Sequence, residues 1–317
     1  MRRAIGLVLL GLGVFLLVLA PALKWYAYPE LAKIPQDQNS GTVATGVGTY
    51  YDPAIGEIKG ANLVATRAVR GDVPAAANAG DDTAVWNVFT RIERLEDSHL
   101  VTARTDRVAM DRRTAMAKDC CGSAPDRRGV TYTFPIPTEK KSYPYYDTSV
   151  ADDFPAKFAG TDTIKGLQVY HFVVTIEPLQ IGEPRTVPGA LVGEPSKPTV
   201  TAAVYYSNVR DIWVEPTTGV VIKGTEQLLQ TLRTDGVEDK ATLVDVTLTF
   251  DDKTQTTQAD TARDARTQII QLSRYGPLLL LLVGALLVVG GLLLLRSPSP
   301  PVGRRRAHAD SNELQPA

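Results

Sequence analysis

Histidine and cysteine, the residues that most often bind metals or act as nucleophiles, are scarce in this 317-residue sequence. There are three histidines, His99, His171 and His308, and two cysteines, Cys120 and Cys121. Neither His99 nor His171 is accompanied by a cysteine pair or by carboxylates at the spacing of a zinc site. We therefore predict no metal site and no cofactor. His171 lies in an apolar segment, where we interpret it as a hydrogen-bonded core residue rather than a ligand.

The sequence motifs of the common catalytic sites are also missing. None of GxSxG, HExxH, SxxK, a P-loop or a GxGxxG that follows a strand is present. Three pairs of adjacent carboxylates stand beside turn residues, where aspartate commonly bonds its own backbone: Asp81-Asp82, Asp152-Asp153 and Asp251-Asp252. We predict that the protein has no catalytic residue and is not an enzyme. A cleft that joins exterior carboxylates to a histidine would be the sign of an unrecognised active site.

Excess positive charge is absent from the central part of the chain. Residues 4–295 carry 28 basic and 33 acidic residues, and hence a net charge of −5. Phosphate binding requires clustered lysine and arginine, so we exclude nucleic acid as a partner. The composition, 44% hydrophobic and 22% charged, is typical of a folded chain and not of a disordered spacer.

Two long hydrophobic runs are present instead. Residues 277–295 (PLLLLLVGALLVVGGLLLL) contain no charge, amide or hydroxyl group. A helix of this length rises about 28 Å, the thickness of the hydrocarbon core of a bilayer. We therefore predict a transmembrane helix at residues 277–295. Arg296 and three further arginines follow, so the positive-inside rule places the tail, residues 296–317, in the cytoplasm.

The second run, residues 4–22, follows Arg2 and Arg3. It is either a signal peptide, with a small-residue cleavage site at residues 20–22, or an uncleaved anchor followed by interfacial aromatic residues. We favour an anchor over residues 1–24. Both alternatives place the middle of the chain outside the cytoplasm. We predict a two-pass plasma-membrane protein with both termini cytoplasmic.

Residues 25–253 are predicted to form one large extracytoplasmic β domain. β-Branched residues concentrate in seven segments: 61–69, 83–95, 100–109, 166–176, 200–209, 219–232 and 241–250. Segment 166–176 has apolar groups on both faces, which indicates a central strand covered on each side or a strand that lines an apolar cavity. The predicted fold class is mainly β (α+β), with a large antiparallel β ectodomain between N- and C-terminal transmembrane helices.

Two further segments have a different character. Residues 254–276 follow helical spacing, so we predict a membrane-proximal helix that is broken or kinked at Gly276-Pro277. Residues 182–198 contain four prolines and three glycines, and we predict an irregular loop there.

Cys120 and Cys121 are adjacent, and thiols outside the cytoplasm tend to be oxidised. Neighbouring cysteines bridge only through a strained eight-membered ring. We favour a vicinal disulfide here, while free thiols and an intermolecular bridge stay open.

Aromatic residues are dense in residues 143–147 and also stand in the neighbouring strand segments. They form either a wall for an apolar ligand or part of the core, where aromatic side chains are common. The ligand-binding residues that we predict are Tyr143, Tyr145, Tyr146, Tyr170, Phe172 and Trp213.

Several short motifs, taken in order, resemble the actinobacterial porin PorA family of membrane proteins. They are Thr45-Gly46, Thr49-Tyr50-Tyr51-Asp52, Asp111-Arg112-Arg113-Thr114, Phe134-Pro135, Tyr143 to Asp147, Gly166 to Tyr170 and Trp213 to Gly219. The family name implies a pore, and the resemblance also implies a link to the assembly of envelope lipoglycans. The layout is similar to that of CD36-type scavenger receptors, in which an ectodomain between two membrane helices holds an apolar tunnel for lipid.

From these features we predict a non-enzymatic protein that binds or hands on lipid or glycolipid in cell-envelope (lipoglycan) assembly. Its predicted partners are the membrane, lipid or lipoglycan, and envelope-synthesis proteins. The alternatives are a scaffold that binds envelope-synthesis enzymes, an enzyme with an unrecognised site, and a pore.

Overall fold

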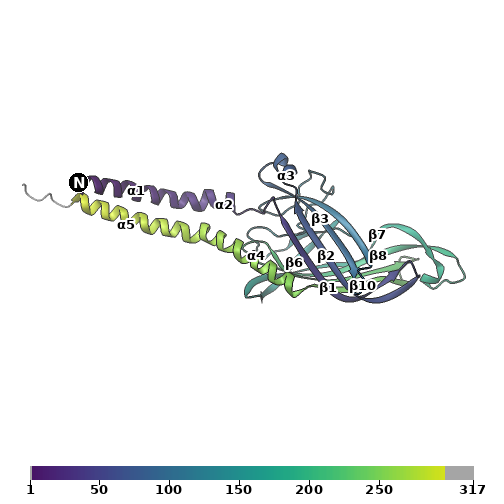
Figure 1. Ribbon diagram of the computed structural model, residues 1–317. Coiled ribbons are helices and arrows are strands. Elements are labelled where there is room, and N and C mark those ends of the chain that lie inside the picture. The colour runs from purple at the N-terminus through teal and green to yellow at the C-terminus, as the bar shows by residue number, and fades with distance from the viewer. Residues whose placement is uncertain (1, 297–317) are drawn as a thin grey trace, which may run out of the picture. The chain divides into compact units, whose positions relative to one another are not determined.

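The computed structural model describes residues 2–296 (Figure 1). The described chain divides into two compact units, one made of residues 2–27 with 272–296 and the other of residues 28–271. The predicted fold class is confirmed, because a ten-stranded antiparallel sheet stands in the sequence between two long apolar helices. The predicted cytoplasmic tail lies, from residue 297 on, outside the described residues.

The first unit is a pair of helices, α1 (Arg2–Ala22) and α5 (Gly276–Arg296), which pack along each other. Each belongs to a helical stretch that is long and apolar enough to cross a membrane. Leucine and valine side chains cover much of the exposed surface of both helices. Such a surface is stable against lipid, where the helix satisfies its own backbone hydrogen bonds.

The line of contact between α1 and α5 is built from small residues. Gly6 and Gly13 of α1 are buried, and their nearest neighbours across the contact are the backbone oxygens of Gly291 and Gly284 of α5. Small residues let two helix backbones approach closely, and close packing is a main source of helix association in lipid. The glycine positions therefore determine which faces of the two helices meet.

A short π-helical stretch borders each apolar helix. The stretch Leu23–Ala27 follows α1 and leads into α2 (Tyr28–Leu31), while Gln271–Tyr275 leads into α5. Pro29 and Pro277 stand just after these stretches. A proline ring clashes with the carbonyl group four residues earlier, and in both cases that carbonyl lies inside the π-helical stretch. The irregularity predicted at Gly276-Pro277 is therefore found one turn earlier.

The second unit contains a single curled antiparallel sheet. Its strands are β1 (Asn39–Asp52), β2 (Glu57–Gly71), β3 (Thr83–Arg94), β4 (Leu100–Asp111), β5 (Tyr143–Asp147), β6 (Asp152–Ile164), β7 (Leu167–Pro188), β8 (Thr199–Val214), β9 (Val221–Arg233) and β10 (Ala241–Phe250). Their spatial order is β4-β3-β2-β1-β10-β9-β8-β7-β6-β5. The outermost strands are thus β4 and β5, which are consecutive in the sequence.

The connection between β4 and β5, residues 112–142, bonds to both outermost strands. Ala117 forms a bridge with Met110 of β4, and Val130 forms a parallel bridge with Tyr145 of β5. Further along, the Phe134 amide donates to the carbonyl of Gly219, in the turn between β8 and β9. The connection therefore crosses the inside of the curled sheet and fills the space between its two edges.

Gly219 is required at this crossing. Its φ of +72° lies in the left-handed region, and an added Cβ would stand 2.1 Å from the carbonyl oxygen of Phe134. Only glycine tolerates both conditions without strain.

Three helical elements accompany the sheet: α3 (Val73–Ala79), the 3-10 turn Gly189–Val192 and α4 (Asp252–Ile270). The helix α4 explains why segment 166–176 is apolar on both faces. Ala259 and Ala262 of α4 pack on Leu167 and Val169 of β7. The following residues of β7 that point to the other face, such as Phe172, belong to the main core.

The seven predicted strand segments lie within or largely overlap β2, β3, β4, β7, β8, β9 and β10. The predicted loop at residues 182–198 is wrong in its first part, because β7 continues to Pro188 and pairs with β8 across register shifts. The shifts accommodate the local glycine and proline residues, since a bulge tolerates an interrupted ladder.

Candidate functional site

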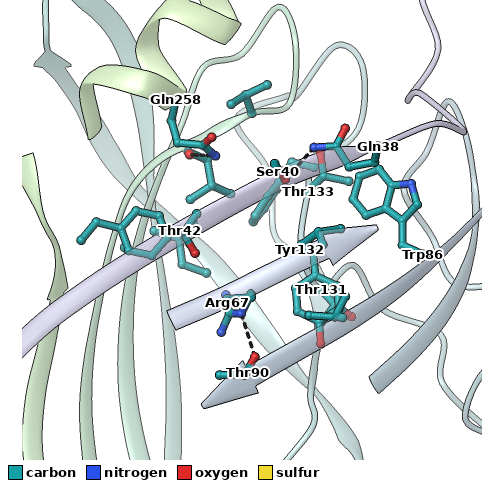
Figure 2. Close-up of a pocket in the computed structure, with 18 of the residues that line it drawn as sticks. Gln38, Ser40, Thr42, Arg67, Trp86, Thr90, Thr131, Tyr132, Thr133 and Gln258 are labelled. Atoms are coloured by element: carbon teal, nitrogen blue, oxygen red, sulfur yellow. Dashed lines mark hydrogen bonds between the residues drawn. The ribbon is translucent and has the colours of Figure 1, made fainter. Parts of the chain in front are cut away.

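A cavity of about 450 Å³ lies inside the second unit (Figure 2). We call it the interior pocket. One wall is the inner face of β1, β2, β3 and β4, and the opposite wall comes from residues 131–136 and from β8 and β9. The curl of the sheet and the crossing connection together create this space.

The two chain segments that lead toward the apolar helices both reach the interior pocket. Residues 32–35, just after α2, line it, as do Gln258, Gln268 and Ile269 of α4. Gln258 donates through its side chain to the carbonyl of Val221 at 3.2 Å, which joins α4 to β9 at this point. One side of the pocket is therefore formed by the parts of the second unit that are nearest in sequence to α1 and α5.

Cross-strand pairing arranges the polar side chains of the sheet wall in rows. Thr42 of β1 pairs with Arg67 of β2, Arg67 pairs with Thr90 of β3, and Thr90 pairs with Arg104 of β4. All four residues line the pocket. The next row that lines it consists of Ser40, Val69, Val88 and Asp106.

Two neighbouring side chains donate hydrogen bonds to the carboxylate of Asp106. The guanidinium group of Arg127 donates to both of its carboxylate oxygens, at 2.8 and 2.9 Å, and the hydroxyl of Tyr132 donates to Oδ2 at 2.6 Å. Burial and the charge of Asp106 both raise the pKa of Tyr132 well above its ordinary range, so this hydroxyl stays protonated. Arg67 lies over the Tyr132 ring, with 5.4 Å from its Cζ to the ring centroid.

A buried arginine occupies the opposite wall. Arg210 of β8 is 7% exposed and donates through Nη2 to Oδ2 of Asp147 at 2.8 Å, while Nη1 is paired with Glu226 of β9. The Tyr206 hydroxyl also donates to Asp147 Oδ2, at 3.2 Å. Buried charges are stable only when they are paired and hydrogen-bonded, and this group meets that condition.

The Asp147 carboxyl is ionised despite its burial. Burial alone would raise its pKa, but the charge of Arg210 and hydrogen bonds from the backbone amides of Ser149 and Val150 outweigh that effect and lower the pKa. Asp147 and Arg210 therefore carry opposite charges at neutral pH.

Two residues that line the pocket keep a buried polar atom without a partner among the described residues. These atoms are Nε of Arg210 and Oγ1 of Thr131. Buried polar groups without a partner are rare in folded proteins, and these two atoms lie behind the surface of the pocket and not on it.

The predicted aromatic ligand residues fall into three places. Tyr145 and Tyr146 line the interior pocket. Tyr143 and Phe172 pack in the core against Phe134, with ring centroids 5.6 and 4.9 Å from it. The predicted ligand set is thus divided between the pocket and the solid core, and the role of these residues stays a prediction.

The remaining two, Tyr170 and Trp213, do not line the pocket. Tyr170 contacts Phe158 edge to face, and Trp213 stacks on His171 at 4.6 Å between centroids. His171 is half-buried and shares a hydrogen bond of 2.7 Å between Nε2 and Oδ1 of Asp211. It is hydrogen-bonded as predicted, but it is not enclosed by the core.

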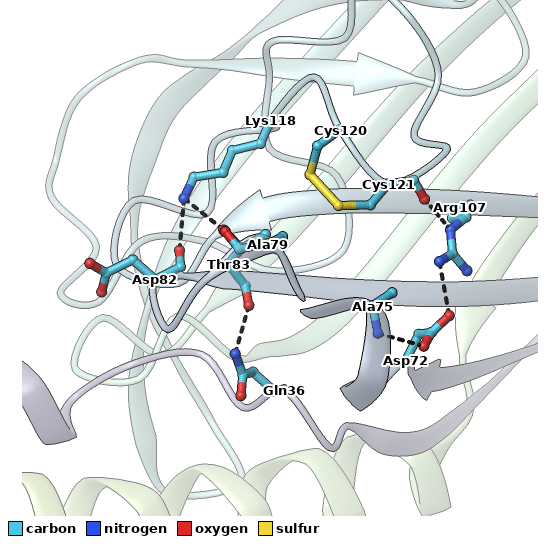
Figure 3. Close-up of a disulfide and its surroundings, with 10 residues drawn as sticks. All are labelled: Gln36, Asp72, Ala75, Ala79, Asp82, Thr83, Arg107, Lys118, Cys120 and Cys121. Carbon is cyan, nitrogen blue, oxygen red and sulfur yellow. Dashed lines mark hydrogen bonds and ion pairs between the residues drawn. A yellow bond between two sulfur atoms is a disulfide. The ribbon is translucent and has the colours of Figure 1, made fainter. Parts of the chain in front are cut away.

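Cys120 and Cys121 are joined by a disulfide (Figure 3). Both pack beside the small cluster that contains Ala76 of α3. Arg107 of β4 donates through Nε to the carbonyl of Cys121 and through Nη2 to the carboxylate of Asp72, 2.8 Å away. Asp72 is the N-cap of α3, so one arginine connects the disulfide turn to the start of this helix.

Within residues 2–296, no group of three or more metal-binding side chains comes together. The described lining of the interior pocket contains carboxylates but no histidine. The sign of an unrecognised active site, a cleft that joins carboxylates to a histidine, is thus not found in this pocket.

The residues of the pocket that carry charge were not predicted from the sequence. Such a residue can be recognised in the sequence when it stands at every second position of a strand together with apolar residues, as Arg210 does with Ile212 and Val214 on β8. Such a residue must be paired inside the protein, because an isolated buried charge is unstable.

Comparison with known proteins gives a consistent result. The family described as Porin PorA matches residues 5–293. A protein named Porin PorA from Corynebacterium amycolatum is 26% identical over 371 aligned positions, which cover 90% of this chain and 96% of that relative. A second Porin PorA, from Corynebacterium resistens, is 24% identical and covers 73% of this chain and 77% of that protein.

These names overturn the predicted function. The relatives are named as porins, so the prediction of a protein that binds or hands on lipid or glycolipid is wrong, and the scaffold alternative gains no support. The pocket gives a physical reason for the correction. Arg67, whose nearest carboxylate oxygen is 3.9 Å away, lies in its wall, and an acyl chain would offer no partner to this guanidinium group.

Proposed function

Because the chain belongs to the porin PorA family, we propose that it is a non-enzymatic channel protein that passes small hydrophilic solutes across a membrane. The observation that carries this proposal is the interior pocket. It is a cavity of about 450 Å³ inside the sheet, with threonine, arginine and acidic side chains in its walls. A cavity of this size with a few well-placed polar groups is typical of sites for small molecules.

The proposed membrane arrangement follows from the two apolar helices. We place α1 and α5 across the plasma membrane as a two-pass anchor, with both termini cytoplasmic and the sheet on the opposite side, so that the interior pocket is the part of the solute path that lies outside this bilayer. The arginines at the two ends of the chain support this orientation. The close contact of α1 with α5 supports an uncleaved first helix, since removal of α1 would expose the glycine face of α5.

Flux measurements test the channel proposal. Full-length protein is reconstituted in liposomes that contain either a small neutral sugar or a small organic anion, and release of each solute is compared with release from protein-free vesicles. Ala65 lines the pocket, so Ala65→Trp fills it. The matched control is Ala103→Trp, because Ala103 is exposed on β4 and does not line the pocket.

We expect release from wild-type vesicles, a strong reduction with Ala65→Trp and no change with Ala103→Trp. Circular dichroism of both variants verifies that the sheet is intact. Absence of release above the protein-free level in the wild type, or equal release with Ala65→Trp, would overturn the proposal.

Labelling tests the orientation separately. Val237, in the turn between β9 and β10, is 77% exposed, and the two native cysteines are bridged. A membrane-impermeant maleimide added to intact cells should label Val237→Cys. Labelling only after the membrane is opened would contradict the orientation.

A further inference from the structure

We infer that the interior pocket selects small oxyanions, such as phosphate or a carboxylate, through the side chains of Arg67, Thr90 and Arg104. This inference takes the proposed function as its context, but its chemistry depends only on the geometry of the pocket. The three residues are neighbours in one row across β2, β3 and β4.

The row brings two cationic side chains to one hydroxyl group. Directly paired residues on neighbouring strands have Cβ atoms about 5 Å apart, so Arg67 and Arg104 flank Thr90 at about that distance on either side. Arg67 Nε already lies 3.4 Å from Thr90 Oγ1 (Figure 2). The row therefore places one arginine on either side of a threonine in the pocket wall.

The acidic groups of the pocket are bound by other side chains. Asp106 is bound by Arg127, and both Asp147 and Glu226 are paired with the buried Arg210. Asp211 also lines the pocket and shares a hydrogen bond with His171. These groups are therefore not the principal partners of Arg67 or Arg104.

Arg67 and Arg104 have only weak or neutral partners among the described residues. The nearest carboxylate oxygen to Arg67 is that of Glu226, at 3.9 Å. Arg104 donates to the hydroxyls of Thr148 and Ser149, at 3.1 and 2.8 Å. Neither of these two guanidinium groups therefore forms a close ion pair among the described residues.

The chemistry of these groups favours an oxyanion over other solutes. A guanidinium group presents several N–H donors in a plane, which matches the oxygens of a carboxylate or a phosphate. A cation would be repelled by these two guanidinium groups, and a neutral solute would leave them without an anionic partner.

Equilibrium binding to the full-length chain in detergent tests the inference without any measurement of flux. Inorganic phosphate and acetate are titrated separately by calorimetry, which distinguishes the two sources of the oxyanion. The variants are Arg67→Gln, Arg104→Gln and the double variant. The matched control is Arg91→Gln, because Arg91 lies on β3 but does not line the pocket.

We expect saturable binding of at least one of the two anions to the wild type. Each single substitution should weaken it about tenfold, as expected for loss of a hydrogen bond to a charged group. Arg91→Gln should leave it unchanged, and Arg67→Lys, which keeps the charge, should weaken it less than Arg67→Gln.

Absence of saturable binding of both anions would overturn the inference, as would equal binding by the double variant. The proposed function fails by a different result, the absence of release of both the neutral sugar and the organic anion from liposomes. Anion binding without release would retain this site and reject the channel, and release without anion binding would do the reverse.

Discussion

Gly13 of α1 lies so close to Gly284 of α5 that a Cβ added to Gly13 would stand 2.7 Å from the Gly284 carbonyl oxygen. No side chain fits into this space without moving one of the two helices. The glycine contact is thus the point at which the first unit is most sensitive to substitution.

We predict that Gly13→Leu separates the helix pair and lowers its stability by about 1–3 kcal/mol, the range observed when extra groups are forced into a packed interface. Unfolding of the detergent-solubilised chain in dodecyl sulfate, followed by circular dichroism, measures this change. Gly11→Leu is the control on the same helix, because a Cβ at Gly11 meets nothing within 4 Å. Equal effects of both substitutions would show that helix composition, and not the contact, determines stability.

The second prediction concerns the buried pair of Arg210 and Asp147, whose side chains are almost fully enclosed. Asp147→Asn leaves Arg210 with Glu226 as its single carboxylate partner. We expect the free energy of unfolding to fall by about 2 kcal/mol, because Arg210 loses one charge-assisted hydrogen bond while its pair with Glu226 stays. Denaturant unfolding measures it, and Asp245→Asn, at an exposed position of β10, should change little.

The same carboxyl predicts a dependence on pH. The pKa of Asp147 in the folded protein is below its ordinary value of 3.8, so the unfolded chain takes up the proton first as the pH falls. Its stabilising effect is fully present above about pH 5 and is lost as the pH drops below the ordinary value toward the folded pKa. Denaturant unfolding of the wild type between about pH 6 and pH 2 should show this loss.

In Asp147→Asn the slope of stability against pH should be smaller over the same range. Identical slopes in the wild type and the variant would assign the acid sensitivity to other carboxyl groups.

The fourth prediction concerns Arg107, which connects the disulfide turn to α3. Arg107→Ala removes both contacts, and we expect the start of α3 to open more easily by about 2 kcal/mol. Hydrogen exchange of the amides in α3 measures local opening. The comparison variant is Arg70→Ala, because the side chain of Arg70 bonds only to the neighbouring carbonyl of Val69 among the described residues. Unchanged exchange in Arg107→Ala would exclude this connection.

Much of the fold could be predicted from local sequence patterns, because β-branched segments and uniformly apolar runs carry their own signal. Three strands could not be predicted in this way. β1 is rich in glycine and threonine and lacks clear alternation, while β5 and β6 contain Pro144 and Pro155. These prolines stand opposite each other in the outermost strand pair, where a missing amide donor is tolerated.

The pocket was less accessible to sequence reasoning than the strands. Arg67, Asp106 and Arg210 belong to strands far apart in the chain, and only the pairing register brings them to one cavity. The regular alternation of buried residues along β8 marks Arg210 as an inward residue. Its partner Asp147 lies at the end of β5, which the sequence does not predict as a strand because it contains Pro144.

The connection between β4 and β5 has a consequence for how this protein behaves beside its own copies. Exposed outermost strands offer free amide and carbonyl groups that can pair with another chain and start aggregation. Here, the bridges at Ala117 and Val130 occupy positions on both outermost strands. The sheet thus has less open border at which a second copy of the chain could pair strand to strand.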